Sequence, residues 1–291
     1  MFRKAVALSS KKHSNLRLAP SDGFGFASKL LTVPIVYSEM ADIAREYPLL
    51  FQKEKDVPIA LLGAEADVNA YVTSEGTWLA SYIPARIMAY PFALTPIPDK
   101  PNEMAMVIDI AAENLGTEVG MPLFESDGKP TPALQSRLTV LGKIREQETV
   151  TARMVRQIRE AGLLVERSLR ISKNDADDRQ IAGLEFVNEK ALNTLSHEEF
   201  MKLRDGGALP LIYSHLLSVA NLRQGVIAGK YVDRSKPDVG VSMVDVDTFL
   251  ASAERQPIRT ASDESEADLS IFADDGDFNL GDLTGKDKIK H

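Results

Sequence analysis

The amino-acid sequence predicts an α+β fold, with a β-rich N-terminal half that contains hairpins and a helical C-terminal half. Three observations support this class. Residues 30–125 hold short β-rich runs separated by glycine and proline turn signals. Residues 132–161 carry apolar side chains at helical spacing, and residues 163–223 combine two strand-like runs with a pair of helices. Strands and helices therefore dominate different parts of the chain, as is typical of α+β proteins.

Changes in composition divide the chain into three segments. Residues 1–28 contain no acidic side chain before Asp22, and their dispersed basic residues predict a solvated N-terminal arm. Residues 1–250 together carry a formal charge of only −3, and residues 29–250 are expected to form a single domain. Residues 251–291 hold ten acidic and five basic residues with little periodicity, which predicts a disordered acidic tail. Four apolar residues interrupt the tail and predict a short docking segment: Ile271, Phe272, Phe278 and Leu280.

The β-rich half begins after the arm and contains one short helix. A helix is expected to end at Tyr47, because a residue that precedes proline avoids helical angles. The turn Ser74-Glu75-Gly76 places glycine where a positive φ is needed, and Trp78 would lie on one strand of the resulting hairpin. The predicted elements are a helix at 39–46, strands at 57–62 and 103–110, and a hairpin at 70–82.

The helical half begins with a long segment of good helix formers. Gly162 follows it at the position of a C-terminal cap, so the helix is expected to end there. A charged loop then separates two strand-like runs, and Gly206-Gly207 separates two helices. The predicted elements are helices at 132–161, 196–204 and 208–223, and strands at 163–171, 181–187 and 239–246.

The composition excludes several kinds of site and partner. The chain of 291 residues has no cysteine, which rules out disulfides, thiolate nucleophiles and cysteine metal sites. Its apolar runs are far shorter than the roughly 18 residues of a membrane-spanning helix, so no transmembrane segment is expected. The body has no basic domain of the kind that binds nucleic acid. Without a recognisable signal sequence, we expect a cytoplasmic protein.

The segment Ser196–Glu199 has two possible interpretations, a metal site or a helix cap. His197 and Glu199, with His215 downstream, formally match the two-histidine, one-carboxylate pattern of non-haem iron sites. On a helix, however, residues two apart point in different directions. Ser196 and Glu199 also match a capping box, in which each side chain bonds the backbone amide of the other residue. The capping box is the favoured interpretation, and no metal site is assigned.

Polar residues recur along the apolar helix at 208–223. His215, Ser218 and Asn221 follow one another at intervals of three, so their side chains can lie along one face. This face could line a pocket. The alternative is that the histidine is a core residue hydrogen-bonded to its neighbours. Tyr213-Ser214-His215 is not a catalytic triad, because adjacent helical residues do not face each other.

An arginine in an apolar, proline-bounded segment is the other candidate. Arg86 needs a carboxylate partner, which could be Asp109 or Glu39 of the same chain or a bound ligand. The same segment contains Trp78 and Tyr90. The sequence assigns no catalytic residue, no metal ligand and no cofactor, and its candidate ligand-binding residues are Arg86, His215, Ser218, Asn221, Trp78 and Tyr90.

Four motifs follow one another between residues 33 and 222. They read VPIVYSEMADIAREYPLLF at 33–51, IALLGAEADVNAYVTSEGTWLASYIPARIMAYPF at 59–92, LFESDGKPT at 123–131 and GGALPLIYSHLLSVANL at 206–222. Together they resemble the SapC family, which is distinct from the peptide-transporter permease of the same name. The resemblance implies a bacterial protein of a surface-layer locus that accompanies export machinery, while other members accompany outer-membrane receptors and oxygenase-like enzymes. It implies no agreed reaction.

We therefore expect a non-enzymatic accessory or binding protein that is linked to the bacterial envelope or to surface-layer protein export. Its expected partners are proteins, such as export machinery or a surface protein. One alternative is an enzyme, or an enzyme subunit, with a metal- or carboxylate-binding polar pocket around His215. A further alternative is a structural component of a large assembly, docked through residues 271–280.

Overall fold

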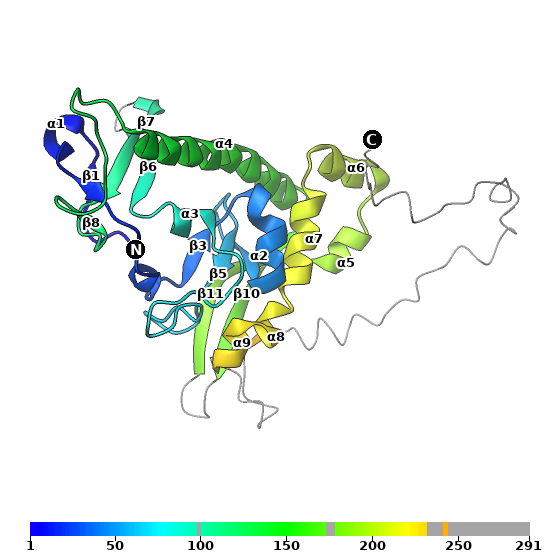
Figure 1. Cartoon of the computed structure of the whole chain (residues 1–291). Helices are drawn as coiled ribbons and strands as arrows, with labels where there is room; N and C mark the ends of the chain where they lie inside the picture. The colour runs from blue at the N-terminus through cyan, green and yellow to red at the C-terminus, as the bar shows by residue number, and fades with distance from the viewer. Residues whose placement is uncertain (98–99, 173–177, 232–240, 244–291) are drawn as a thin grey trace, which may run out of the picture. The chain divides into compact units, whose positions relative to one another are not determined.

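The protein is described from a computed structural model, which covers residues 1–97, 100–172, 178–231 and 241–243. The chain divides into two units, Met1–Val246 and Asp247–His291. The expected acidic tail, with its docking segment, lies outside the described residues, and the strand expected at 239–246 is described only over 241–243. Figure 1 shows the helices and strands of the first unit.

The largest sheet has six antiparallel strands in the order β12-β10-β11-β4-β5-β3. The strands are β3 (Thr32–Pro34), β4 (Leu49–Gln52), β5 (Ile59–Leu61), β10 (Leu164–Ser172), β11 (Asp178–Val187) and β12 (Val241–Met243). All of β5 and the first three residues of β4 are buried, as expected for central strands that are covered on both faces. The edge strand β3 ends at Pro34, which cannot donate to a sheet ladder.

Two smaller sheets tie the N-terminal segment to the rest of the unit. One has the order β1-β7-β6 and the other β8-β2-β9. Their strands are β1 (Ala5–Ala7), β2 (Arg17–Leu18), β6 (Phe92–Ile97), β7 (Lys100–Asp109), β8 (Leu115–Gly116) and β9 (Met121–Pro122). Ala5 pairs with Asp109, and Leu18 pairs with both Leu115 and Met121. Residues 1–28, expected to be an arm, therefore contribute strands to both sheets.

Helices cover the sheets and fill the second half of the chain. The helical elements are η1 (Gly25–Ala27), η2 (Tyr37–Glu39), α1 (Ser10–His13), α2 (Met40–Glu46), α3 (Ala85–Met88), α4 (Pro132–Glu160), α5 (Glu189–Asn193), α6 (His197–Asp205), α7 (Leu209–Ser218), α8 (Asn221–Gln224) and α9 (Val226–Tyr231). The structure confirms the α+β class, with antiparallel sheets in the N-terminal half and most helical residues after residue 131.

The long helix α4 connects two hydrophobic cores. It has 29 residues, about 43 Å of helix, and Thr131 caps its start by accepting from the Leu134 N–H. Leu141 and Ile144 pack in a smaller core with β6 and β7, whereas Val155 and Ile158 pack in the larger core with the six-stranded sheet. Figure 1 shows α4 extending across both regions.

Two expected elements differ in detail from the structure. The hairpin at 70–82 is closed by a single bridge between Val72 and Trp78, and Gly76 has the expected positive φ of 83°. The helix expected at 208–223 is divided into α7 and α8. The Ala220 N–H bonds the carbonyl of residue 217, three positions back, so the chain tightens between the two helices.

Candidate functional site

His215 is a completely enclosed side chain of α7 that joins two strands. Its Nδ1 lies 2.7 Å from the Leu49 carbonyl of β4, and its Nε2 accepts from the Val187 N–H of β11 at 3.1 Å. Because an amide can only donate, Nε2 is unprotonated and Nδ1 carries the hydrogen. The ring lies near Phe51 and Phe186. Burial lowers the pKa of His215 to about 4, so this side chain is neutral at pH 7.

The two polar residues that follow His215 also bond to the backbone of the α2–β4 segment. Ser218 Oγ accepts from the Leu49 N–H at 2.9 Å and donates to a carbonyl of its own helix at 2.7 Å. Asn221 Nδ2 donates to the carbonyls of Ala44, at 2.9 Å, and Tyr47, at 3.1 Å. The structure thus brings His215, Ser218 and Asn221 together as a clamp on main-chain groups.

The segment Ser196–Glu199 forms the expected capping box. Ser196 Oγ accepts from the Glu199 N–H at 3.3 Å, and Glu199 Oε2 accepts from the Ser196 N–H at 3.0 Å. His197 is exposed on α6, whereas His215 is buried on α7. No group of three or more His, Asp or Glu side chains among the described residues could hold a metal ion.

Trp78 is held by Tyr47 of the first motif. Its Nε1 donates to the Tyr47 hydroxyl at 2.7 Å, and that hydroxyl donates to the Tyr82 carbonyl. Tyr71 packs beside Tyr47 with ring centroids 4.4 Å apart and donates to the Glu46 carbonyl at 2.8 Å. Burial raises the pKa of both Tyr47 and Tyr71, so their hydroxyls remain protonated donors. Trp78 therefore serves the packing of this region.

Glu39 is a buried carboxylate at the end of η2 that holds the chain before α3. It accepts from the Ala85 N–H at 2.7 Å, from the Tyr82 hydroxyl at 2.9 Å and from the Val36 N–H at 3.1 Å. Only 3% of the residue is exposed. A buried carboxylate needs hydrogen-bond donors in place of water, and these three donors meet that need for Glu39.

Arg86 pairs within the chain, but with a residue that the sequence did not indicate. Its guanidinium contacts Glu148 of α4, which also pairs with Arg145 at 3.0 Å. The two partners expected from the sequence were Asp109 and Glu39. Burial lowers the pKa of Arg86, while the charge of Glu39 acts in the opposite direction. Arg86 lies apart from the His215 clamp, on a different helix.

Tyr90 lies in the turn after α3 and bonds to a buried aspartate. Its hydroxyl donates to Asp109 Oδ2 at 3.0 Å, and burial, reinforced by this bond, raises the pKa of Tyr90 to about 12. Burial tends to raise the pKa of Asp109 as well. The backbone N–H groups of Arg3, Lys4 and Ala111 donate hydrogen bonds to the Asp109 carboxylate. These bonds outweigh the effect of burial and hold the pKa of Asp109 below its usual value. Tyr90 is therefore a fixed, neutral ring.

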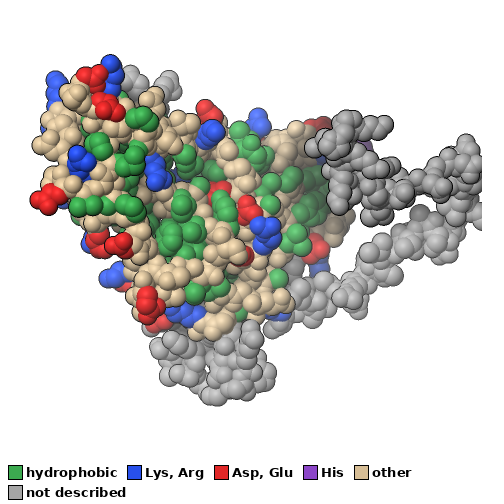
Figure 2. All heavy atoms as spheres, in the orientation of Figure 1, with side chains coloured by type: hydrophobic (Ala, Val, Ile, Leu, Met, Phe, Trp, Pro, Cys, Tyr) green, Lys and Arg blue, Asp and Glu red, His purple; other side chains and the backbone are tan. Residues whose placement is uncertain are grey.

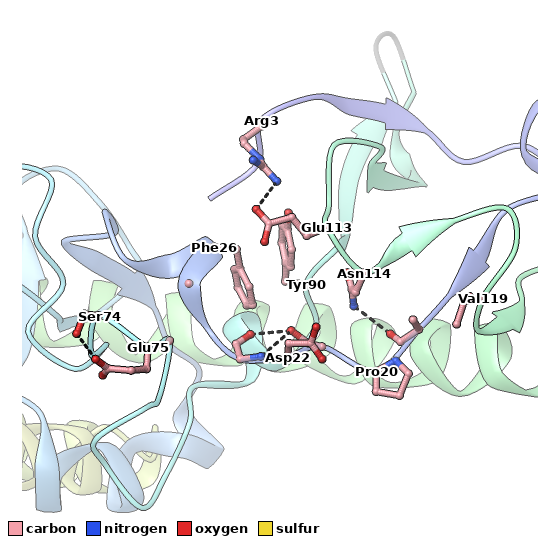
Figure 3. Close-up of a pocket in the computed structure, with 15 residues that line it drawn as sticks. Arg3, Pro20, Asp22, Phe26, Ser74, Glu75, Tyr90, Glu113, Asn114 and Val119 are labelled. Carbon is pink, nitrogen blue, oxygen red and sulfur yellow. Dashed lines mark hydrogen bonds and ion pairs between the residues drawn. The ribbon is translucent and has the colours of Figure 1, made fainter.

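Tyr90 also lines an open hollow of about 560 Å³. In Figure 3 the ring of Phe26 lies against the ring of Tyr90, and their centroids are 4.0 Å apart. Gly23 and Gly76 form part of the wall, where the Phe24 N–H donates to the Gly76 carbonyl at 2.8 Å. A Cβ on Gly23 would lie 2.8 Å from that carbonyl oxygen, so only glycine permits this approach.

Charged side chains of separate segments surround the hollow. Asp22, Glu75 and Glu113 contribute carboxylates, and Arg3 pairs with Glu113 at 3.3 Å. Figure 3 shows Glu113 and Arg3 on one side and Glu75 on another, with Asn114 bonded to the chain before Asp22. The three acidic side chains exceed the single arginine, so the lining carries net negative charge.

The sequence indicated only Tyr90 among the residues of this hollow. Phe26 and Asp22 belong to the DGFGFA segment, which has the glycine and aromatic residues of a turn but no chemical signature. A chain of ring contacts nevertheless connects two of the predicted residues, from Trp78 through Phe24 and Phe26 to Tyr90. His215, Ser218, Asn221 and Trp78 do not line the three hollows identified within the described part of the first unit.

These features define an α+β protein whose buried polar motifs hold its backbone together and whose surface offers an open hollow. The chain matches the SapC family over residues 8–224 and belongs to that family. No curated protein and no solved structure matches the chain. In the part of the chain that the structure describes, no helix has the length and apolar character needed to span a membrane.

Proposed function

We propose that this SapC-family member is a non-enzymatic accessory protein of the cytoplasm that binds a protein partner in bacterial envelope or surface-layer protein export. One observation carries the proposal. His215, Ser218 and Asn221, the polar residues best placed for chemistry by sequence, bond to backbone groups of Ala44, Tyr47, Leu49 and Val187. Such bonds serve the stability of the fold and leave the imidazole closed to a substrate.

The hollow beside Tyr90 is the proposed contact with the partner. Its volume of about 560 Å³ is within the range of ligand-binding pockets, and it is open to the surface. Val119, at its margin, is 71% exposed, and the stacked rings of Phe26 and Tyr90 provide a rigid apolar surface. An aromatic surface beside polar groups suits a peptide segment of another protein. The segment at 271–280 is proposed as a second contact.

Site-specific photo-cross-linking tests this proposal in cells that naturally produce the protein. A photoreactive residue replaces Val119 or Ser74, which both line the hollow, and a third variant carries it in place of the exposed Glu198 of α6. We expect the same protein to be cross-linked from Val119 and Ser74 and to be absent at Glu198. An identical pattern at all three positions would refute the hollow as the contact.

A second experiment addresses the non-enzymatic character directly. Candidate small molecules are incubated with purified wild-type protein and with His215→Gln, whose folding is verified by the fluorescence of Trp78. Neither protein is expected to convert them. Turnover that requires His215 in a folded protein would favour the enzyme interpretation instead.

A further inference from the structure

A second hollow lies where the two hydrophobic cores meet. It encloses about 160 Å³ between β3, an edge strand of the six-stranded sheet, and β6, an edge strand of a three-stranded sheet. Figure 2 shows hydrophobic side chains gathered on this face, below α4 and around α3. We call this hollow the inter-core slot. Its apolar lining includes Leu30, Val33, Phe92, Leu94, Leu141 and Ile144.

Three charged side chains stand in the wall of the otherwise mainly apolar slot. Arg86 of α3 and Arg145 of α4 both pair with Glu148, one with each carboxylate oxygen. Glu148 is only 16% exposed, whereas Arg145 is 47% exposed. Two guanidinium groups thus share one carboxylate, and the three side chains carry a formal charge of +1.

Arg86 retains a donor that its neighbours do not use. Among the described residues, Arg86 Nε is buried and has no hydrogen-bond partner. Glu39 attracts Arg86 electrostatically, but its oxygens already accept from Val36, Ala85 and Tyr82. A buried donor without an acceptor is costly, and an oxygen supplied by a ligand would relieve that cost.

We propose that the inter-core slot binds a small amphipathic carboxylate, a ligand site separate from the partner contact beside Tyr90. The carboxylate accepts from the guanidinium groups of Arg86 and Arg145, since arginine donors match carboxylate geometry. The hydrocarbon part packs against side chains of both cores, such as Val33 and Ile144. A cavity of about 150 Å³ accommodates benzene, so the slot suits an apolar group of about six carbons.

Sodium hexanoate is the probe for this site. Titration of the full chain, labelled at isoleucine, leucine and valine methyl groups, is followed by NMR. We expect signals of Leu94 and Ile144 to shift with a Kd of about 1 mM, while Ile212 of α7 stays unchanged. Acetate, which lacks the chain, and hexanol, which lacks the charge, are expected to bind at least about tenfold more weakly. Equal binding of hexanol and hexanoate would overturn the role of the arginines.

Two variants assign the site without changing the partly buried Arg86. Arg145→Gln is expected to weaken hexanoate binding by about tenfold or more, the loss of one charge-assisted contact, whereas Arg137→Gln on the same helix should bind normally. Ala93→Leu fills the slot from β6 and should abolish binding, with Trp78 fluorescence confirming the fold. Shifts that persist in Ala93→Leu, or no shifts in wild type at about 10-fold the expected Kd, would refute the proposal.

Discussion

The buried imidazole of His215 makes the stability of the fold depend on pH. Its pKa is about 4 in the folded protein against 6.5 for an ordinary histidine, because burial penalises the charged form. Between these values the unfolded chain takes up a proton that the folded chain does not. Stability therefore falls as the pH decreases from about 6.5 towards 4, by about 1.4 kcal/mol per pH unit and about 3 kcal/mol in total.

Urea unfolding followed by the fluorescence of Trp78 measures this effect, since Trp78 is the only tryptophan. The comparison is between wild type and His215→Gln at several pH values from 7.5 to 5. At pH 7.5 the variant should be less stable by about 1–3 kcal/mol, because bonds to Leu49 and Val187 are lost or weakened. On acidification from pH 6.5 to 5, wild type should lose about 2 kcal/mol more than the variant.

The difference between the two proteins is the decisive quantity, because carboxylates titrate in both. Glu199 has a lowered pKa, chiefly through its bond from Ser196, and it contributes equally to each curve. A control, His197→Gln, changes an exposed histidine of α6 and should retain the pH dependence of wild type. If wild type and His215→Gln lose stability in parallel down to pH 5, the clamp does not hold a neutral imidazole and the reasoning fails.

Three further substitutions test other parts of the fold by their effect on the free energy of unfolding in urea. Ser196→Ala removes the capping box of α6 and should cost about 1 kcal/mol, whereas a midpoint equal to that of wild type would contradict the cap. Gly76→Ala, at a φ of 83°, should destabilise the fold by more than about 1 kcal/mol. The control is Gly142→Ala within α4, where the added Cβ has no atom within 4 Å, and it should stabilise the fold by roughly 0.5–1 kcal/mol. Ser218→Ala leaves the buried Leu49 N–H without this acceptor and should cost about 1–3 kcal/mol, and a neutral result would exclude it from the clamp.

The elements with strong local patterns were predictable from the sequence. The helix expected at 132–161 is α4, Pro132–Glu160, because its apolar spacing, proline start and glycine end all favour one structure. The strands expected at 163–171 and 181–187 are β10 and β11. In contrast, β1 and β2 gave no signal, because these strands are only three and two residues long and pair with residues about 100 positions later.

The candidate site was predictable in its residue types but not in its contacts. Spacing placed His215, Ser218 and Asn221 on one face of an expected helix. In the structure Asn221 lies on the separate helix α8, and all three side chains bond to backbone groups. Their partners are backbone groups of residues such as Leu49 and Ala44. Every residue has the same backbone carbonyl, so the sequence gives no sign of which residues these side chains will bond. The carboxylate partner of Arg86 was missed for a related reason, since only packing of α4 beside α3 brings Glu148 to it.

Three of the four motifs that identify the SapC family are bonded to one another. Residues 33–51 supply Glu39 and Tyr47, which bond to the segment at 78–85. They also supply Leu49, whose carbonyl is bonded by His215 of α7. Side chains with such fixed internal partners specify a scaffold. The charged groups around the Tyr90 hollow and the exposed Arg145 of the slot lie mostly outside those motifs. We therefore expect relatives to share the clamp around Leu49 while differing in what they bind.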